Sequence, residues 1–488
     1  MIGGGIAGLA AAVRLRERAP AGTRITVYEQ SAALGGKLRT GRLAGAASEL
    51  GAEAFLAGDP AGGDSAAVAL AHRLGLGPGL RHPAVVPAAI AIDGHLAPVP
   101  RGTLVGVPGD LAAVAPVAHP DAWRDRDEGR PLLAPGEDVT VGALVRRRLG
   151  DEVVDRLVDP MLGGVYAGRA DRLSLAATMP TLARAATAQH TLVGAVRAAQ
   201  ARARRTPGAP IFATLAGGVG RLVAGAAAAS GAELRLGLPV RELTRTPTGW
   251  RLVLGPVPAP ETADVDAVIL AVPAGPATRL LAGVGITLDG PDYASVALVS
   301  FAVPDAGLPA LSGFLVPAAD GRLVKAATLL TRKWEHLRRP DGIAVIRASV
   351  GRYGEEHVLQ RDDPELAAAV HGELRALLGT PLGAPIDTHV QRWGGALPQY
   401  TPGHLDRIAA VRAALRTRHP TLALAGAAYD GVGIPACVSS GEAAADTVLA
   451  ALRTRRTVPA GTGGPDQGCT DQGGTDRESR TPLEGWVP

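Results

Sequence analysis

A glycine fingerprint at the start of the chain restricts its fold more than any other feature. Gly3, Gly5 and Gly8 form the pattern G-x-G-x-x-G, and Glu29 ends the next β-branched run, about twenty residues on. The first glycine permits a tight turn, the second lets the backbone approach a pyrophosphate, and the third lets helix and strand pack closely. The helix N-terminus then directs its partial positive charge at the phosphates. The pattern predicts a Rossmann-like dinucleotide site, with Glu29 accepting hydrogen bonds from an unmodified adenosine ribose.

The strand that should lead into this turn is reduced to Met1 and Ile2. A buried parallel strand usually has about five residues. We therefore expect the natural start of the chain to lie upstream, which the intact mass of the native protein would test.

The rest of the chain alternates between helical and strand-like patterns. Helix-period runs between about residues 60 and 210, notably Val139 to Leu157 and Leu182 to Arg205, predict a mainly helical insertion. Helices are also expected up to Arg18 and from about Ser440 to Arg453. The expected strands are Arg24 to Tyr28, Glu233 to Leu236, Trp250 to Leu254, Ala267 to Val272, Ser295 to Val303, Gly313 to Val316, Arg322 to Leu330, Gly342 to Val350 and Leu422 to Ala425.

Composition excludes several classes of protein. A net charge of +4 over 488 residues is too small for a nucleic-acid-binding signature, although it is compatible with a small acidic substrate. Cys437 and Cys469 cannot form a disulfide framework, which favours a reducing cytoplasm. The histidines lack metal-site spacing, and the apolar runs are too short for a membrane span or secretion signal. We expect no metal, no nucleic acid and at most peripheral membrane contact.

Two further glycine clusters indicate the kind of dinucleotide. Gly35-Gly36-Lys37-Leu38, followed by Glu49-Leu50-Gly51-Ala52, resembles the FAD enzymes of the amine oxidase, phytoene desaturase and protoporphyrinogen oxidase superfamily. In that group the second glycine pair lies against the flavin half, and the basic residue supports the diphosphate or the ring. Near the other end, Gly426, Tyr429 and the run Gly431 to Pro435 precede a helix whose N-terminus would meet the flavin. FAD is therefore expected rather than NAD.

Motifs spread over residues 1 to 452 give a closer resemblance. They are Gly3 to Gly8, Gly35 to Lys37, Gly51 to Phe55, Pro160 to Gly168 with Leu173-Ser174, Thr214 to Gly218, Arg392-Trp393, Ala396 to Tyr400 with Gly403-His404, and Gly431 to Pro435. In this order they resemble the protoporphyrinogen/coproporphyrinogen oxidase family, specifically the soluble, FAD-dependent type of Gram-positive bacteria.

The resemblance implies an α/β architecture in which a Rossmann-like FAD-binding domain is interleaved with an α+β substrate-binding domain and a helical insertion. We predict that residues 1–60, 211–290 and 396–455 form the FAD-binding domain. Residues 61–210 and 291–395 form the substrate-binding domain, and residues 456–488 are predicted to be a disordered tail because their composition buries little apolar surface.

The resemblance also implies the site residues. The expected FAD contacts are Gly3, Gly4, Gly5, Ile6, Ala7, Gly8, Glu29, Gln30, Lys37, Gly51, Ala52, Glu53, Ala54, Val240, Gly426, Val432, Gly433 and Ile434. Gly164 would direct a backbone carbonyl at the pyrrole N–H groups of a porphyrinogen, and Arg101 is a candidate for a propionate. Tyr166 either lines the pocket or packs in the core. No catalytic side chain is assigned, because flavin N5 would accept the hydride.

The expected activity is oxidation of coproporphyrinogen III to coproporphyrin III in haem biosynthesis, with O2 as acceptor and H2O2 as by-product. Protoporphyrinogen IX is the alternative substrate, and a hand-over of product to a ferrochelatase and a monomer or homodimer are expected. A flavin amine oxidase is disfavoured by the scarcity of aromatic residues, which make up 3% of the chain. A non-catalytic flavin- or haem-binding protein is a third reading. His404 is interpreted as the end of a loop rather than a proton shuttle, and Cys437 as a small buried residue.

Overall fold

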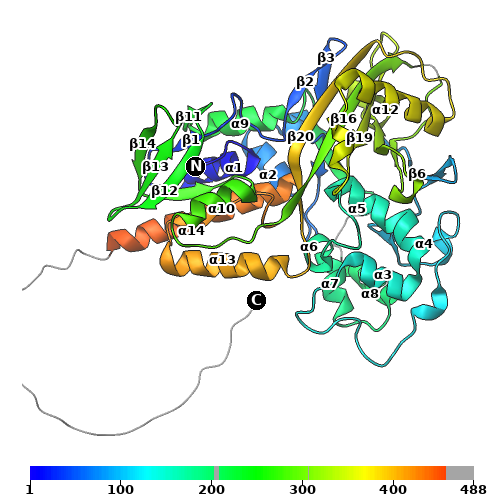
Figure 1. Cartoon of the computed structure of the whole chain (residues 1–488), viewed down its shortest axis with the longest axis horizontal. Coiled ribbons are helices and arrows are strands. Elements are labelled where there is room, and N and C mark those ends of the chain that lie inside the picture. The colour runs from blue at the N-terminus through cyan, green and yellow to red at the C-terminus, as the bar shows by residue number, and fades with distance from the viewer. Residues whose placement is uncertain (203–207, 306, 458–488) are drawn as a thin grey trace, which may run out of the picture.

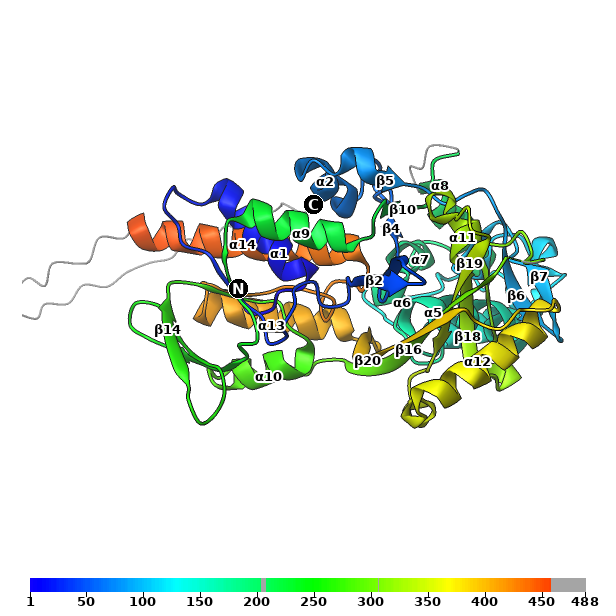
Figure 2. The ribbon, with the colours of Figure 1, turned by 90° about the horizontal axis from the view of Figure 1, so that it is seen from above.

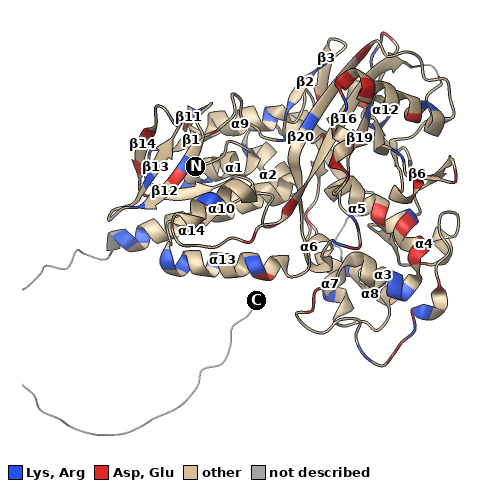
Figure 3. Ribbon diagram, in the orientation of Figure 1, with Lys and Arg blue, Asp and Glu red and all other residues tan. Residues whose placement is uncertain are grey.

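The computed structural model describes residues 1–202, 208–305 and 307–457. Figures 1 and 2 show two lobes side by side. The first, called here the parallel-sheet lobe, holds the N-terminus and the last described helix. The second, called the mixed-sheet lobe, is built on a seven-stranded sheet with a group of helices beside it. Basic and acidic residues are interspersed over both lobes (Figure 3).

The parallel-sheet lobe is built on two pairs of parallel strands. β1 (Thr26–Tyr28) pairs with β11 (Glu233–Arg235), and β15 (Val268–Leu270) pairs with β21 (Leu422–Leu424). Ile2 joins the two pairs through parallel bridges to Tyr28 and Leu270. Met1 and Ile2, the short remainder of the expected first strand, therefore lie at the centre of this sheet.

Helices and a small antiparallel sheet cover the two faces of the parallel sheet. One face packs against α1 (Ile6–Arg18), α9 (Gly220–Ser230) and α14 (Ile434–Thr457), with α2 (Ala66–Arg73) beside them. The other face packs against α10 (Ala274–Ala282), α13 (His404–Arg418) and the sheet of β12 (Val240–Arg245), β13 (Trp250–Leu254) and β14 (Glu261–Val265). Both faces of the sheet are covered because apolar side chains alternate between them along β15. Ile269 packs in the core with α1, α9 and α14, while Val268 and Leu270 pack in the core with α10 and α13.

The mixed-sheet lobe has the strand order β20-β16-β19-β18-β17-β6-β7. Its strands are β20 (Asp387–Gln399), β16 (Asp292–Pro304), β19 (Ile343–Val350), β18 (Val324–Leu329), β17 (Gly313–Leu315), β6 (Ala88–Ile92) and β7 (His95–Pro98). The helix α12 (Asp363–Leu378) covers one face, where its leucines pack against the inward side chains of β16 and β19. The opposite face of the sheet is turned toward the parallel-sheet lobe, since Arg347 on β19 donates to the carbonyl oxygen of Gly51 at 3.0 Å.

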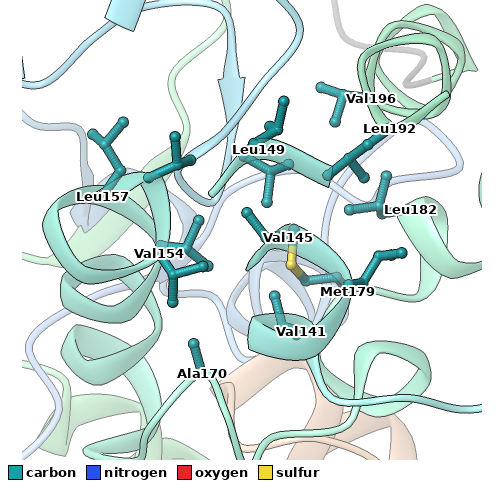
Figure 4. Close-up of a cluster of buried hydrophobic side chains, with 14 of the residues drawn as sticks. Val141, Val145, Leu149, Val154, Leu157, Ala170, Met179, Leu182, Leu192 and Val196 are labelled. Carbon is teal, nitrogen blue, oxygen red and sulfur yellow. The ribbon is translucent and has the colours of Figure 1, made fainter. Parts of the chain in front are cut away.

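A cluster of helices completes the mixed-sheet lobe. They are α3 (Val141–Leu149), α4 (Asp151–Val153), a π-helical turn (Val154–Val158), α5 (Asp159–Tyr166), α6 (Leu175–Thr178), α7 (Pro180–Ala186) and α8 (Leu192–Arg202). Figure 4 shows their shared core, in which Val145 of α3 and Leu192 of α8 converge with Met179, the residue between α6 and α7. This cluster fixes the position of α5 against β17 and β18.

Short elements connect the lobes. β4 (Phe55–Leu56), β10 (Phe212–Leu215) and β5 (Leu80–Arg81) form a three-stranded sheet, while β2 (Thr40–Leu43) with β3 (Ala46–Glu49) and β8 (Thr103–Leu104) with β9 (Val107–Pro108) are hairpins. The one-turn helix α11 (Leu330–Lys333) follows β18.

The helical insertion differs from the prediction in two ways. The region contains strands β5 to β9, and β6 and β7 join the seven-stranded sheet, so the segment is not uniformly helical. The predicted helix from Val139 is broken at Gly150, which has a left-handed φ of 87° that a side chain would strain. The predicted helix from Leu182 is two helices, because the chain turns after Ala186. Local helix-period patterns could not reveal these turns.

The last helix also differs from the prediction. α14 begins at Ile434, before the expected Ser440, and runs to Thr457, so residues 456 and 457 belong to the helix and not to the predicted tail. Residues 458–488 lie outside the described residues. The predicted domain boundary between residues 395 and 396 falls within β20, a strand that continues from the mixed sheet toward the parallel-sheet lobe.

Candidate functional site

The N-terminus of α1 forms a backbone cradle. The third glycine of the fingerprint packs tightly, since a Cβ on Gly8 would lie 2.1 Å from the carbonyl oxygen of Gly3. Gly5 differs, because a Cβ there would meet nothing within 4 Å and its backbone is extended (φ −73°). No side chain caps the first N–H groups of α1. These groups are therefore available to an anion, and the open space beside Gly5 is suited to a pyrophosphate.

Glu29 lies at the carboxyl end of β1, as predicted, but it also supports the glycine loop. Its carboxylate accepts hydrogen bonds from the N–H of Gly4 at 2.7 Å and from the N–H of Ser31 at 2.9 Å. Its backbone carbonyl accepts from the N–H of Leu238 at 2.9 Å, which brings the half-buried Val240 to the same end of the sheet. Glu29 and Val240, distant in sequence, therefore lie together, while Gln30 is exposed beside them.

The second glycine pair lies against the first. The N–H of Gly35 donates to the carbonyl of Gly4 at 2.8 Å, and a Cβ on Gly36 would lie 3.6 Å from the Cα of Gly5. Lys37 follows, and the N–H of Ala52 donates to its carbonyl at 3.1 Å. The predicted segments around residues 3, 35 and 51 are thus brought together.

Lys37 is a half-buried cation without a counterion. Within the described part of the chain its ammonium makes no ion pair or hydrogen bond. Burial lowers its pKa, and the neighbouring Cys437 thiol at the start of α14 raises it slightly. An uncompensated cation beside an open backbone cradle is suited to a phosphate or an electron-rich ring.

The loop between β21 and α14, residues 425–433, lies beside the backbone cradle at the N-terminus of α1. Gly441 lets α14 cross α1 closely, because a Cβ there would lie 2.1 Å from the carbonyl oxygen of Ala7. The Ser440 hydroxyl accepts from the N–H of Gly426 and donates to Asp430, which is paired with Arg412 at 2.6 Å. This network fixes the loop over the α1 N-terminus.

The loop also contacts both lobes. Val432 packs against the helical cluster, whereas Ile434 packs in the core under the parallel sheet. Gly433 lies between them and precedes the first residue of α14. These three residues, predicted to lie near the isoalloxazine, are therefore at the junction between the lobes.

The side chain of Glu53 joins the two lobes. It was expected to contact FAD, but its buried carboxylate pairs with Lys333 at 2.6 Å and with Arg347 at 2.5 Å. Burial raises the pKa of Glu53, but the two cations outweigh that effect and hold it at about 2. The side chain therefore anchors the segment Gly51 to Ala54 to the mixed-sheet lobe, and only its backbone remains for a cofactor.

The pKa of Glu49, four residues before Glu53, is shifted in the opposite direction. Its carboxylate accepts from the N–H of Val219 at 2.6 Å and from the Thr40 hydroxyl at 3.1 Å. Burial raises its pKa to about 7, because these neutral donors only partly replace water.

On the mixed-sheet side, Gly164 is exposed in the last turn of α5. Among the described residues its carbonyl oxygen accepts no hydrogen bond, since α5 ends at Tyr166 and the next residue, Ala167, has the left-handed conformation. A Cβ on Gly164 would lie 3.3 Å from Leu315 on β17. A free carbonyl on an exposed glycine agrees with the predicted contact to pyrrole N–H groups.

Tyr166 packs in the core rather than standing open. It is 8% exposed and lies edge-on to Tyr400, with ring centroids 5.8 Å apart. Tyr400 in turn stacks on His404 at 4.4 Å. His404 is the first residue of α13 and is buried, so it does not end an exposed loop. Arg101 is exposed in the turn after β7, with no ion pair or hydrogen bond among the described residues.

Sequence reasoning missed three cations of the mixed-sheet lobe, Lys325, Lys333 and Arg347. A signal was present, because only three of the 50 basic residues are lysines, and Lys37 is the third. In a chain with so strong a preference for arginine, a retained lysine is unusual. Only the fold reveals that Lys333 and Arg347 meet Glu53.

Comparison with known proteins identifies the family. The model of the family described as flavin-containing amine oxidoreductases matches residues 6–449. The chain belongs to this family. Membership confirms the predicted flavin cofactor and the oxidoreductase class, and it places the predicted resemblance in the correct superfamily.

Named relatives extend along almost the whole chain. A coproporphyrinogen III oxidase of Mycobacterium tuberculosis is 37% identical, covering 93% of this chain and 97% of its own. A coproporphyrinogen III oxidase of Bacillus subtilis is 29% identical over 93% of this chain and 98% of its own. A crystal structure from Exiguobacterium, provisionally assigned as a protoporphyrinogen oxidase, has a TM-score of 0.78 at 30% identity, covering 92% and 98% of the two chains.

The residues present fit FAD. The open space at Gly5, the uncapped α1 N-terminus and the ammonium of Lys37 would hold the diphosphate half, and Glu29 would lie on the adenosine side. Within the described ranges no group of three or more potential metal ligands occurs. No helix in the described part of the chain is long and apolar enough to cross a membrane.

We expect Lys37→Met to weaken FAD binding about tenfold, which corresponds to about 1.4 kcal/mol, because the cation is unpaired without a ligand. Quenching of flavin fluorescence on titration into the apoprotein measures this. Arg42→Met is the matched control, since that guanidinium donates to the Gly45 carbonyl within its own hairpin. Equal FAD affinity of Lys37→Met and the wild type would contradict the assignment.

Proposed function

We propose that the protein oxidises coproporphyrinogen III to coproporphyrin III, using FAD and passing the electrons to O2. The observation that carries the proposal is the alignment with relatives named coproporphyrinogen III oxidase along 93% of the chain. The free carbonyl of Gly164, close to Leu315 of the mixed sheet, supports it from the geometry. One coproporphyrinogen loses six hydrogens, so three O2 are converted to three H2O2 for each porphyrin formed.

The contribution of this chain is placement. When bound, FAD supplies a hydride acceptor at N5 and a route for electrons to oxygen. Gly164 would accept a hydrogen bond from a pyrrole N–H and so orient the macrocycle, while the loop Gly431 to Ile434 fixes the cofactor between the lobes. A reacting carbon held at about 3 to 3.5 Å from its acceptor gains most of its rate from such placement.

Two buried aromatic side chains near the site, Tyr166 and His404, are not assigned as bases. Burial raises the pKa of Tyr166 to about 12, so the phenol stays protonated at pH 7. His404 is 1% exposed and its Nε2 lies 3.2 Å from the Tyr429 carbonyl oxygen, so its ring is not open to a substrate. We therefore assign no general base.

The test is a fluorescence assay of the holoenzyme with each porphyrinogen under air. We expect coproporphyrinogen III to become fluorescent at least tenfold faster than its autoxidation, with stoichiometric H2O2, and faster than protoporphyrinogen IX. If neither substrate becomes fluorescent faster than it autoxidises, the proposed function is wrong. A faster rate with protoporphyrinogen IX would reverse the substrate assignment.

Protoporphyrinogen IX is kept as the second candidate because of two similarities. The Exiguobacterium structure is provisionally assigned that activity, and a protoporphyrinogen oxidase of Macaca fascicularis is 29% identical over 92% of this chain. Putrescine oxidase structures at 18% identity support the fold alone. The hand-over to a ferrochelatase, the oligomeric state and the cytoplasmic location stay predictions.

A further inference from the structure

Lys325 is a buried cation that the mechanism above does not use. Its residue is 6% exposed, and within the described part of the chain it makes no ion pair or hydrogen bond. Burying an ammonium without a partner opposes folding, so natural proteins usually pair such groups. Two partly buried cations of the mixed-sheet lobe follow this rule, because Lys333 and Arg347 share the Glu53 carboxylate.

The surroundings of Lys325 are positive. Arg347 lies on the neighbouring strand β19, and Arg352 follows that strand. Arg352 is itself buried, donates to the carbonyl oxygens of Val316 and Arg322 at 3.3 and 3.1 Å, and has only the distant Glu355 carboxylate at 3.7 Å. Burial and the charges of Arg352 and Arg347 together lower the pKa of Lys325 to about 7. These charges attract an anion, and residues 1–202, 208–305 and 307–457 provide no carboxylate that pairs with Lys325.

The backbone places this positive group beside the substrate helix. Lys325 is the second residue of β18, and its carbonyl accepts from the N–H of Val316 on the strand that carries Leu315. Leu315 is opposite Ala326 in the register and lies 3.3 Å from the position of a Cβ on Gly164. Lys325 is therefore one residue along the strand from the part of the sheet that faces the exposed end of α5.

A register shift separates Lys325 from the core on the α12 side. Val324 and Ala327 both belong to the apolar cluster under α12, three positions apart, because the strand bulges between Val324 and Ala326. The α12 carboxylate Glu373 is occupied by the N–H groups of Leu323 and Val324, at 3.0 and 2.8 Å. The charges that act on Lys325 come instead from Arg347, on the face toward the parallel-sheet lobe, and from Arg352.

Resting on the proposed function, we propose that Lys325 binds a propionate carboxylate of the tetrapyrrole whose pyrrole N–H groups meet Gly164. The two groups then recognise different parts of one molecule. The carbonyl of Gly164 accepts from the N–H groups at the centre of the macrocycle, and the ammonium of Lys325 pairs with a propionate at its edge. The carboxylate supplies the counterion that Lys325 lacks, so binding and the protonated form of Lys325 favour each other.

The test measures binding and stability together, with Lys325→Met, Lys325→Arg and the wild-type holoenzyme. Coproporphyrin III and its uncharged tetramethyl ester are titrated, with porphyrin fluorescence as the readout. We expect Lys325→Met to bind coproporphyrin III at least tenfold more weakly and the ester unchanged, while Lys325→Arg stays within about threefold of wild type. Lys325→Met should also raise the thermal unfolding midpoint of the porphyrin-free holoenzyme, since an unpaired buried charge is removed.

Unchanged binding of coproporphyrin III by Lys325→Met overturns the inference, as does an equal loss for the ester, which would indicate a change of shape instead of charge. Lys325→Gln gives the same comparison if the methionine variant fails to fold. Wild-type turnover separates the two proposals. If the wild type oxidises coproporphyrinogen III but Lys325→Met binds its product normally, only the role of Lys325 fails; if the wild type neither oxidises nor binds these tetrapyrroles, both proposals fail.

Discussion

Gly5→Ala is expected to weaken FAD binding at least 100-fold while leaving the apoprotein as stable as the wild type. The residue has an extended backbone that any amino acid adopts, and apart from its two chain neighbours no residue has an atom within 4 Å of the added methyl group. Only a ligand explains why this position is glycine. A methyl group there occupies the space of the pyrophosphate and separates it from the N–H groups of α1, at a cost of about 2.7 kcal/mol.

Two other glycines provide the controls. Gly8→Ala should destabilise the apoprotein itself, because its Cβ would lie 2.1 Å from the Gly3 carbonyl oxygen. Gly372→Ala, at an exposed and open position within α12, should change neither FAD affinity nor activity and should stabilise the helix by up to about 1 kcal/mol. FAD affinity is measured by flavin fluorescence and stability by denaturant unfolding of the apoproteins. If Gly5→Ala binds FAD as well as the wild type, the cradle has been assigned to the wrong ligand.

Glu53→Gln is expected to lower the free energy of unfolding by about 3 to 5 kcal/mol, because it leaves Lys333 and Arg347 as buried cations without a counterion. The pKa of Glu53 is held at about 2, below its unfolded value of about 4.5, so its stabilising contribution is complete above that unfolded value. The contribution is lost as the pH falls toward 2. The variant should therefore lose less stability than the wild type between pH 5 and pH 2.

An exposed ion pair serves as the control for Glu53. Arg251 and Asp264 lie 2.7 Å apart, about as close as Glu53 and Lys333, but both side chains are more than half exposed. Asp264→Asn should therefore change the free energy of unfolding by less than about 1 kcal/mol. Thermal and denaturant unfolding over the pH range measure both variants. An equal and small effect of the two substitutions would show that the Glu53 pairs do not hold the lobes together.

Local sequence patterns predicted the central elements because their signals are short-range. The glycine fingerprint preceded α1, and the β-branched runs near Val27 and Val299 proved to be strands. The structure also brought the glycine clusters near residues 5, 35 and 431 to one end of the parallel sheet. The helix predictions from periodicity failed in the insertion. There β6 lies between β17 and the edge strand β7 of the seven-stranded sheet, and the helix predicted from Val139 ends before Gly150. Strand pairing between distant segments leaves no local signature.

The sequence by itself determined the kind of cofactor and predicted its site, because the contacts of a dinucleotide are made by backbone groups, and glycines at fixed spacing record where a backbone must approach a ligand. The tertiary structure decided the partners of the charged side chains. It paired Glu53 with Lys333 and Arg347, and among the described residues it left Lys325 buried without a counterion. The physical reason is that the energy of a charge depends on burial and on its neighbours in space, which a linear sequence does not specify.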